Sequence, residues 1–252
     1  MLGLLNTVLS KGNTLLTYVK DGLVMANRFL TPPKLTFPVS GTAAFNGTSD
    51  YIDTDNPFSH TNHTIAAWVY LDNSSATKIV FDNRDGGDDG IVFYFASNDQ
   101  PTYLVNSAVI STSIISENNW YFVVGTYDGT TQKLYVDGSL ISSQATSQTI
   151  NTTTNAIIGA RSHTSPASYM NGNLANVAIW NRALTSDEIN SVMWKPYQAL
   201  TATESNGLQA WYSLDDIASP TASLANMEQL ATDKDATIEN KAAITAAINS
   251  LS

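Results

Sequence analysis

The sequence predicts an all-β protein, a sandwich of two antiparallel sheets, on three observations. From about residue 35 the chain consists of short runs rich in Val, Ile, Tyr, Phe and Trp, separated by clusters of Gly, Asn and Asp, a pattern typical of strands and turns. Thr, Ser and Asn contribute 78 of the 252 residues, and charged residues only 13%. Short polar side chains favour strands and turns over exposed helices. Helical patterns occur only outside the central run of strands.

The strands are predicted where apolar and β-branched residues alternate with polar ones. These runs are 43–45, 51–53, 64–71, 78–81, 91–96, 102–105, 109–115, 120–127, 133–136, 139–142, 156–160 and 174–180. Many short strands at regular spacing indicate a sandwich or a barrel. A further alternating run, 207–214, is expected to return to the sandwich as an edge or central strand.

Turns and one helix complete the predicted elements. Asp128-Gly129 and Asp137-Gly138 each stand between two strand-like runs, and both residue types tolerate the positive φ of tight hairpins. Thr185 and Glu188 form a capping box, which predicts a short helix that begins there. Small helices are also predicted in the C-terminal tail, 217–252.

The first 35 residues are expected to form an arm that contains a short amphipathic helix. Apolar residues recur there at helical spacing, and the residues assigned to the contacts of this arm are Leu2, Leu5, Val8, Leu9, Lys11 and Lys20. Four basic residues against one acid give the arm a charge of +3, so the rest of the chain carries −13. Such an arm could dock on a neighbouring copy or pack on its own domain.

Composition argues against several classes of function. A net charge of −10, with 12 scattered Lys and Arg residues, argues against nucleic-acid binding, which needs a basic surface. The chain has no cysteine, so disulfides, thiol nucleophiles and iron–sulfur clusters are excluded. No apolar run reaches the roughly 18 residues of a membrane span. The first residues lack the features of a secretory signal, so none is expected.

Several short motifs follow one another between residues 42 and 195. They are Ala44-Phe45-Asn46-Gly47, Thr64-Ile65-Ala66-Ala67-Trp68-Val69, Gly125-Thr126-Tyr127-Asp128-Gly129, Lys133-Leu134-Tyr135-Val136-Asp137-Gly138, Ile157-Ile158-Gly159 and Asn171-Gly172-Asn173-Leu174-Ala175-Asn176. In this order and spacing the chain resembles the laminin-G-like, concanavalin-A-like lectin and glucanase family. The resemblance implies a two-sheet antiparallel jelly roll over residues 36–216. It says less about function, because one fold hosts many different sites.

Catalysis is not expected. The resemblance implies that a glucanase would carry a Glu-x-Asp-x-x-Glu run, which presents paired carboxylates to the sugar from one strand face. The five glutamates are instead dispersed, at Glu117, Glu188, Glu204, Glu228 and Glu239. Gly-x-Ser-x-Gly and phosphate-loop patterns are absent as well. The protein is therefore predicted to be non-catalytic.

Metal binding is considered at two pairs or clusters of residues. His60 and His63 are close in sequence, but no third ligand accompanies them, and we expect solvated loop histidines. Hard cations such as calcium bind several oxygens on flexible loops, and one loop contains the acids Asp82, Asp85, Asp88 and Asp89. Their carboxylates repel one another unless a cation or Arg84 offsets the charge; a solvated hairpin tip is the alternative.

A second calcium candidate rests on the resemblance. Members of the family often place calcium near a Phe-Asp-Gly turn and a later Gly-x-Ile-Asp-Asp segment. The corresponding residues here are Asn46, Gly47, Ala175 and Asn176. The family's acids are absent from these positions, so fewer charged ligands are available and a weaker site is implied. Calcium is the only cofactor that the sequence suggests.

Glycan binding would use exposed aromatic rings that stack on a sugar, with amides that donate hydrogen bonds to its hydroxyls. The candidate ligand-binding residues are Tyr94, Tyr103, Tyr169, Asn171 and Asn173, the last three in or beside the loop 162–173. The tryptophans of the strand-like runs are instead expected to fill the core between the two sheets. They are Trp68, Trp120, Trp180 and Trp211.

Two functions follow from these observations. The first is a lectin-like domain that recognises glycans or a cell surface and forms homo-oligomers or joins a larger assembly. The second is a structural or decoration protein of a virion, in which the arm anchors each copy and no sugar is bound. Both place the protein outside the cell or on a virion surface.

Overall fold

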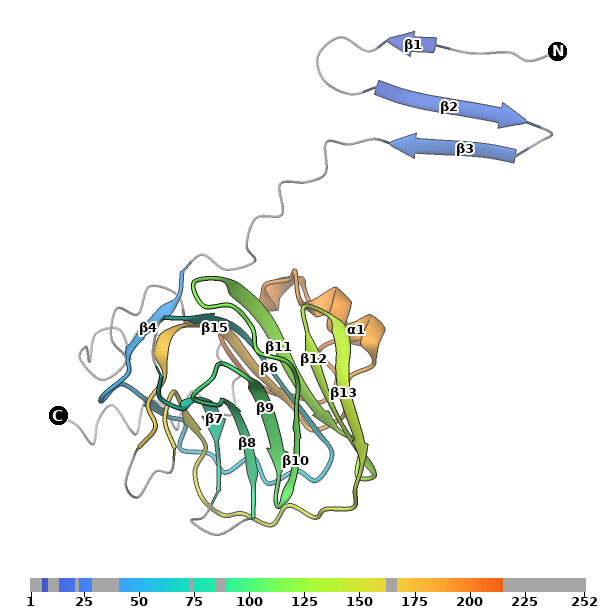
Figure 1. Ribbon diagram of the computed structural model, residues 1–252. Coiled ribbons are helices and arrows are strands. Elements are labelled where there is room, and N and C mark those ends of the chain that lie inside the picture. The colour runs from blue at the N-terminus through green and yellow to red at the C-terminus, as the bar shows by residue number, and fades with distance from the viewer. Residues whose placement is uncertain are drawn as a thin grey trace. The chain divides into compact units, whose positions relative to one another are not determined.

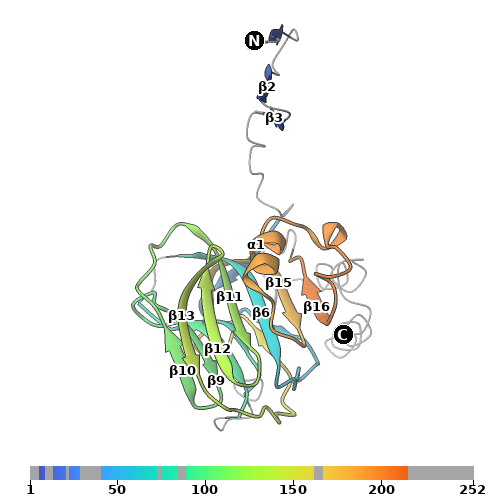
Figure 2. The ribbon, with the colours of Figure 1, turned by 90° about the vertical axis from the view of Figure 1, so that its right-hand side faces the viewer.

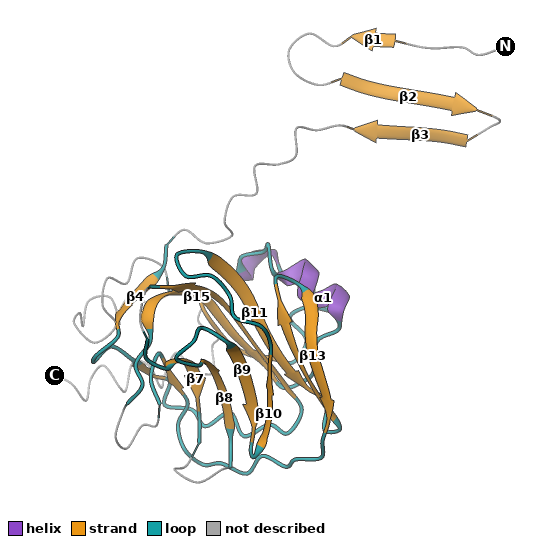
Figure 3. Cartoon of the chain, viewed as in Figure 1, coloured by secondary structure: helices purple, strands orange, loops and turns teal. Residues whose placement is uncertain are grey.

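The computed structural model describes residues 41–72, 75–84, 89–161 and 167–214, together with three strands nearer the N-terminus. The chain divides into two compact units, Met1–Pro38 and Val39–Ser252. Strands are far more abundant than helices (Figure 3), which confirms the all-β prediction. The helices predicted within 217–252 lie outside the described residues.

The first unit contains a three-stranded antiparallel sheet in the order β1-β2-β3. Its strands are β1 (Asn6–Val8), β2 (Thr14–Lys20) and β3 (Leu23–Arg28). Lys20 is opposite Leu23, and the two residues between them in the sequence are Asp21 and Gly22, a pair that favours tight hairpins.

Strand β1 lies where the sequence analysis expected a short helix, so that prediction is wrong at Asn6–Val8. An isolated helix of this length is marginal in water, whereas β2 offers a strand with which β1 can pair. Among the residues assigned to the arm, Val8 lies in β1 and Lys20 in β2. Leu2, Leu5, Leu9 and Lys11 lie outside the described residues.

The second unit is a sandwich of two antiparallel sheets (Figure 1). The six-stranded sheet has the order β10 (Ala108–Ser111), β9 (Pro101–Val105), β8 (Ile91–Phe95), β7 (Lys78–Asp82), β14 (Ile157–Ile158) and β5 (Ile52–Asp53). The seven-stranded sheet contains β13 (Ser139–Ala145), β12 (Thr131–Val136), β11 (Trp120–Tyr127), β6 (His63–Leu71), β15 (Asn171–Trp180), β16 (Leu208–Tyr212) and β4 (Ala43–Asn46). The predicted jelly-roll sandwich is thereby confirmed.

Strand β15 carries two partners along the same edge of the seven-stranded sheet. Its first residues, 171–174, pair with β4, and its last residues, from Val177 to Trp180, pair with β16. Strand β16 corresponds to the alternating run at 207–214, so the prediction that this run returns to the sandwich is confirmed, with the strand at an edge.

The core lies between the two sheets and follows the alternation of each strand. Ala67, Val69 and Leu71 of β6 face Phe93 and Phe95 of β8 within one cluster of buried apolar residues. Every second residue of these strands therefore points to the outer face of its sheet. What covers each outer face decides whether that face is available to a ligand.

The outer face of the seven-stranded sheet is covered by α1 (Ser186–Val192) and the residues that follow it (Figure 2). Trp68, Trp180 and Trp211 are buried beneath this layer and not between the sheets, which corrects their predicted position. Trp68 packs against Trp194 at 5.3 Å between ring centroids, and its indole N–H donates to the carbonyl of Met193. Trp120, the fourth tryptophan assigned to the core, is half-buried and packs against Tyr70.

Helix α1 begins with the predicted capping box, in which Thr185 and Glu188 satisfy each other's backbone N–H groups. The segment after α1 is held by Glu204, whose carboxylate accepts hydrogen bonds from Lys195 Nζ at 2.6 and 2.9 Å. Burial by itself would raise the pKa of Glu204, but the bonds from Lys195, Ser191 and Thr201 hold it at about 2. Among the described residues, no helix has the length and apolar character needed to cross a membrane.

The two predicted turns differ in length. Asp137 and Gly138, with φ of 48° and 76°, form the two-residue hairpin between β12 and β13, as predicted. Asp128 and Gly129 belong to a longer turn, in which Asp128 Oδ1 accepts hydrogen bonds from the backbone of Thr130 and Thr131.

The two sheets are in close contact where Gly125 of β11 faces the ring of Tyr103 of β9. A Cβ atom at Gly125 would lie 2.5 Å from Tyr103 Cδ2, so we expect Gly125→Ala to lower the free energy of unfolding by about 1 to 3 kcal/mol through overpacking. Urea unfolding measures the change. In combination with Tyr103→Leu the same alanine should cost less; an unchanged cost would show that the ring is not the obstacle.

Candidate functional site

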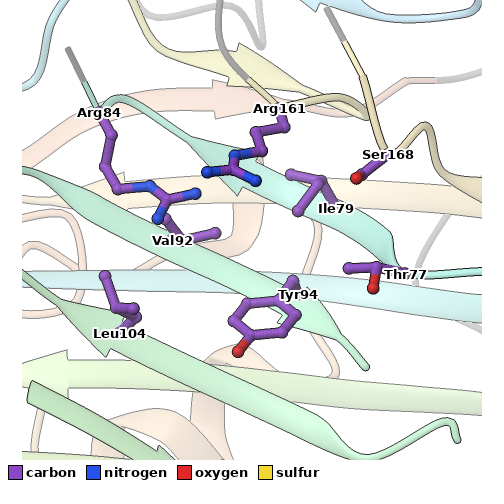
Figure 4. Close-up of a pocket in the computed structure, with 8 residues that line it drawn as sticks. All are labelled: Thr77, Ile79, Arg84, Val92, Tyr94, Leu104, Arg161 and Ser168. Carbon is purple, nitrogen blue, oxygen red and sulfur yellow. The ribbon is translucent and has the colours of Figure 1, made fainter. Parts of the chain in front are cut away.

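A groove of about 230 Å³ lies on the outer face of the six-stranded sheet (Figure 4). It is lined by Thr77, Ile79, Arg84, Val92, Tyr94, Leu104, Arg161 and Ser168. Among the described residues, no carboxylate belongs to this lining. The groove therefore presents donors of hydrogen bonds and positive charge on the surface of an acidic protein.

The floor of the groove follows from the strand alternation. Phe93 and Tyr103 belong to the core between the sheets, so their neighbours Val92, Tyr94 and Leu104 point to the outer face. Val92 is nonetheless buried, and Figure 4 shows both arginine side chains reaching over it. The aliphatic stems of arginine cover apolar surface in this way while the charged group stays accessible.

Arg84 is held in place by Asp82, the last residue of β7. The guanidinium donates through Nε at 3.3 Å and Nη2 at 3.0 Å to the Asp82 carboxylate, whose side chain is fully buried. The backbone N–H of Arg84 donates to the same carboxylate at 2.9 Å. Asp82 thus fixes the orientation of Arg84. Arg84 in turn offsets the charge of the Asp82 carboxylate, which is one of the possibilities considered for the acidic loop.

Arg161 and Ser168 come from the segment after β14. The backbone groups of Arg161 and Ala167 exchange hydrogen bonds at 2.8 and 3.0 Å, and Ile79 N–H donates to the Ser168 carbonyl at 3.3 Å. These bonds place both residues over β7. Arg161 is exposed, and no carboxylate among the described residues forms an ion pair with it.

The predicted ligand-binding residues do not form one site. Tyr94 lines the groove and is half-buried. Tyr103 is fully buried in the core, so it cannot stack on a ligand and that prediction is wrong. Its hydroxyl bonds to His63 Nε2 inside the sandwich, and burial raises the pKa of the Tyr103 phenol well above its usual range.

The other three predicted residues lie beside the groove or on the opposite sheet. Tyr169 follows Ser168 in the chain but does not belong to the lining. Asn171 pairs with Asn46 in the β4–β15 ladder. Asn173 Nδ2 donates to Thr42 Oγ1 at 2.9 Å. None of these three residues belongs to the described lining of the groove.

The calcium site implied by the resemblance does not assemble. Asn46 Oδ1 accepts hydrogen bonds from the backbone N–H groups of Thr48, Ser49 and Asp50. The lone pairs of this oxygen are therefore already directed at hydrogen-bond donors and not at a cation. Asn176 Oδ1 accepts from Trp211 Nε1 at 3.3 Å. Asn46 is opposite Asn171, five residues before Asn176 on β15, which separates the two amides by roughly 16 Å along the strand. Gly47 instead forms a turn, with φ of 75°.

The acidic loop gives no metal site among its described residues either. Asp82 is engaged by Arg84, and Asp89 Oδ1 accepts from the backbone N–H of Asn151 at 3.2 Å. Asp85 and Asp88 lie outside the described residues. Within the described part of the chain, no group of three or more His, Asp or Glu side chains could hold a metal ion.

His63 is buried, which corrects the expectation of a solvated loop histidine. It is the first residue of β6, and its Nδ1 lies 3.0 Å from the His60 carbonyl and 2.9 Å from that of Thr61. This places the proton of a neutral ring on Nδ1 and makes Nε2 the acceptor for Tyr103. His60 is half-buried, and its Nε2 lies 3.2 Å from Gln209 Oε1.

Sequence reasoning missed both arginines as binding residues. Arg161 immediately precedes the loop 162–173 that was considered for a surface site, and Ser168 lies within it. Arg84 was considered only as a partner of the acidic loop. A usable signal was present in the sequence. Each arginine follows a buried strand by two or three residues, Arg84 after β7 and Arg161 after β14, so it can reach back over the outer face.

Comparison with known proteins agrees with the fold. The family model of the concanavalin A-like lectin/glucanases superfamily matches residues 46–190. No curated protein sequence matches the chain. A Bacteroides ovatus protein, proposed to bind carbohydrate, superposes with a TM-score of 0.58 at 18% identity; the match covers 83% of this chain and 62% of that one.

A second similar structure is the CBM40 domain of the Ruminococcus gnavus IT-sialidase, bound to α2,3-sialyllactose. It superposes with a TM-score of 0.53 at 15% identity, over 61% of this chain and 96% of the domain. At such low identities these two structures establish the fold alone.

The buried histidine predicts a specific dependence of stability on pH. Burial lowers the pKa of His63 to about 4, although the carbonyls of Thr61 and His60 act in the opposite direction. Between about pH 6.5 and pH 4 the unfolded chain therefore binds a proton that the folded chain does not. Stability should fall by about 1.4 kcal/mol per pH unit as the pH is lowered through this window, or about 3 kcal/mol in total.

Urea unfolding of the wild type and of His63→Asn at several pH values between 7 and 4 isolates this contribution. The asparagine keeps a donor for the two carbonyls but does not titrate. The stability difference between the two proteins should shrink as the pH falls. Parallel pH profiles would show that His63 does not titrate on unfolding.

Proposed function

We infer that this chain, which belongs to the concanavalin A-like lectin/glucanases superfamily, is a non-catalytic, lectin-like protein that binds a glycan in the groove around Tyr94. The observation that carries the proposal is the composition of that groove. An aromatic ring, two guanidinium groups and two hydroxyls surround one concave space on the outer face of the six-stranded sheet.

Each part of the groove suits a sugar. The face of an aromatic ring packs against the C–H face of a pyranose. Guanidinium groups donate hydrogen bonds to the sugar hydroxyls, and protein hydroxyls both donate to them and accept from them. The volume of about 230 Å³ is below the roughly 300 to 1,000 Å³ of pockets for drug-sized ligands. We therefore propose that the groove holds a single terminal sugar ring of a longer chain.

The similar structures support a glycan as the class of ligand. The CBM40 domain of Ruminococcus gnavus is bound to sialyllactose, and the Bacteroides ovatus protein was proposed to bind carbohydrate. The present chain spans 62% of the length of the latter, so any wider activity of that protein is not carried over.

The absence of catalysis is part of the proposal. Hydrolysis of a glycosidic bond by the usual route needs two carboxyl groups about 5 to 10 Å apart on either side of the bond. The described lining of the groove contains neither Asp nor Glu, and the nearby Asp82 carboxylate is buried against Arg84. The groove can therefore bind a sugar but holds no acid–base pair to cleave it.

A glycan array followed by calorimetry on the best ligand tests this function. Tyr94→Ala should weaken binding by about tenfold, the worth of one aromatic contact, whereas Tyr94→Phe keeps the ring and should stay within about threefold of the wild type. Thermal unfolding checks that both variants are folded. Equal affinity in Tyr94→Ala would move the site elsewhere, and an array without any bound glycan would refute the lectin function.

We propose assembly into a larger particle, such as a virion, as a second candidate function. The first unit supports it, because residues 1–38 form a compact unit with its own sheet and the first 35 residues carry a charge of +3 beside a rest of −13. Opposite charges on two units of one chain favour contact between different copies. Either function would place the protein outside the cell or on a virion.

Sedimentation of the full chain and of a variant that lacks residues 1–38 tests the assembly role. We expect the full chain to form oligomers at low salt that dissociate at high salt, since charge contacts are screened, and the shortened variant to stay monomeric. Identical behaviour of the two proteins would remove the first unit from any assembly contact.

A further inference from the structure

We propose that the groove selects sugars that carry a carboxylate, and that Arg161 recognises this charge. The inference rests on the proposed function and names the class of glycan within it. It is drawn from the charge balance of the groove, from the hydrogen bonds that each arginine makes or leaves unused, and from the shape of the space between them.

The charge balance of the groove is opposite to that of the protein. The chain has a net charge of −10, yet two arginines and no acid belong to the described lining of the groove. Figure 4 shows both guanidinium groups over the same part of the floor, next to Val92.

The two arginines are not equivalent. Arg84 is neutralised by the buried Asp82, which accepts hydrogen bonds from Nε and Nη2 and leaves the Nη1 hydrogens without a hydrogen-bond partner among the described residues. Arg161 has no carboxylate partner in that part of the chain. One full positive charge is therefore unbalanced at the groove, and it belongs to Arg161. Asp82 is a positioning residue, because it orients Arg84 and does not face the groove itself.

A carboxylate fits this arrangement better than a neutral hydroxyl. The planar guanidinium of Arg161 can donate two parallel hydrogen bonds to the two oxygens of a carboxylate, the strongest geometry available to it. Nη1 of Arg84 would add a donor from the other side. A neutral sugar would leave the charge of Arg161 unmatched, so the groove should discriminate between an acidic sugar and its neutral ester.

The remaining lining residues can hold the sugar ring itself. Tyr94 and Leu104 provide the apolar floor, and the hydroxyls of Thr77 and Ser168 lie at the side of the groove away from Leu104 (Figure 4). A ring with its carboxylate toward the arginines would cover Tyr94 and direct hydroxyls toward Thr77 and Ser168. Sialic acids and uronic acids share this chemistry, a six-membered ring with an attached carboxylate.

The test uses the full chain with two acidic probes, 3′-sialyllactose and trigalacturonic acid, each compared with its own methyl ester by calorimetry. At least one acid should bind at least tenfold more tightly than its ester. Arg161→Gln should reduce that preference to less than about twofold. Lys133→Gln removes the same charge from β12 of the other sheet and should leave the preference unchanged.

The outcomes separate this inference from the proposed function. Preference for sialyllactose alone or for the uronate alone would support the inference and identify the source of the carboxylate. Equal binding of acids and esters, or a preference that survives Arg161→Gln, would overturn it while glycan binding itself stands. An array and calorimetry without binding of any neutral or acidic glycan would overturn both. Arg161 is exposed, so its replacement should not disturb folding, which thermal unfolding verifies.

Discussion

The contact between Tyr103 and the opposite sheet is the constraint on which the sandwich depends. The ring of Tyr103 lies against Gly125, where no side chain could fit, and its hydroxyl bonds to the buried His63. A hydrogen-bonded polar pair inside an apolar core restricts how the two sheets can slide, because any other register would leave buried polar atoms without partners. With the register set, every strand presents a defined set of residues to the core and another to the outside.

The outer faces of the two sheets differ in what covers them. On the seven-stranded sheet, large aromatic residues point outward and are buried by α1 and the segment that Glu204 and Lys195 hold in place. On the six-stranded sheet, Tyr94 and Leu104 point outward and, among the described residues, are flanked by the side chains of the groove. An apolar floor that is not covered by another layer is a typical place for a ligand. The candidate site therefore lies on the six-stranded sheet chiefly because the described helical layer covers the outer face of the other sheet.

Several charged residues of the described structure form ion pairs. The ion pairs Asp82–Arg84, Lys78–Asp99, Arg182–Glu188 and Lys195–Glu204 each match one cation with one acid, so most described cations are committed to the fold. Arg161 stands outside these pairs. In a chain with only 12 basic residues, an arginine that faces a concave surface without a carboxylate partner in the described structure is a strong indication of an anionic ligand.

Local sequence patterns were sufficient to predict the strands, the capping box at Thr185 and the hairpin at Asp137-Gly138, because alternation, capping and turn chemistry act over a few neighbouring residues. It also indicated the family. Alternation does not tell which face of a strand meets the other sheet, so Tyr103 was expected at the surface and Trp68 between the sheets, the reverse of what the fold shows. Only the tertiary structure brought Arg84 and Arg161, 77 positions apart in the sequence, to one groove, because that proximity arises from the pairing of β7 with β14 and not from any local pattern.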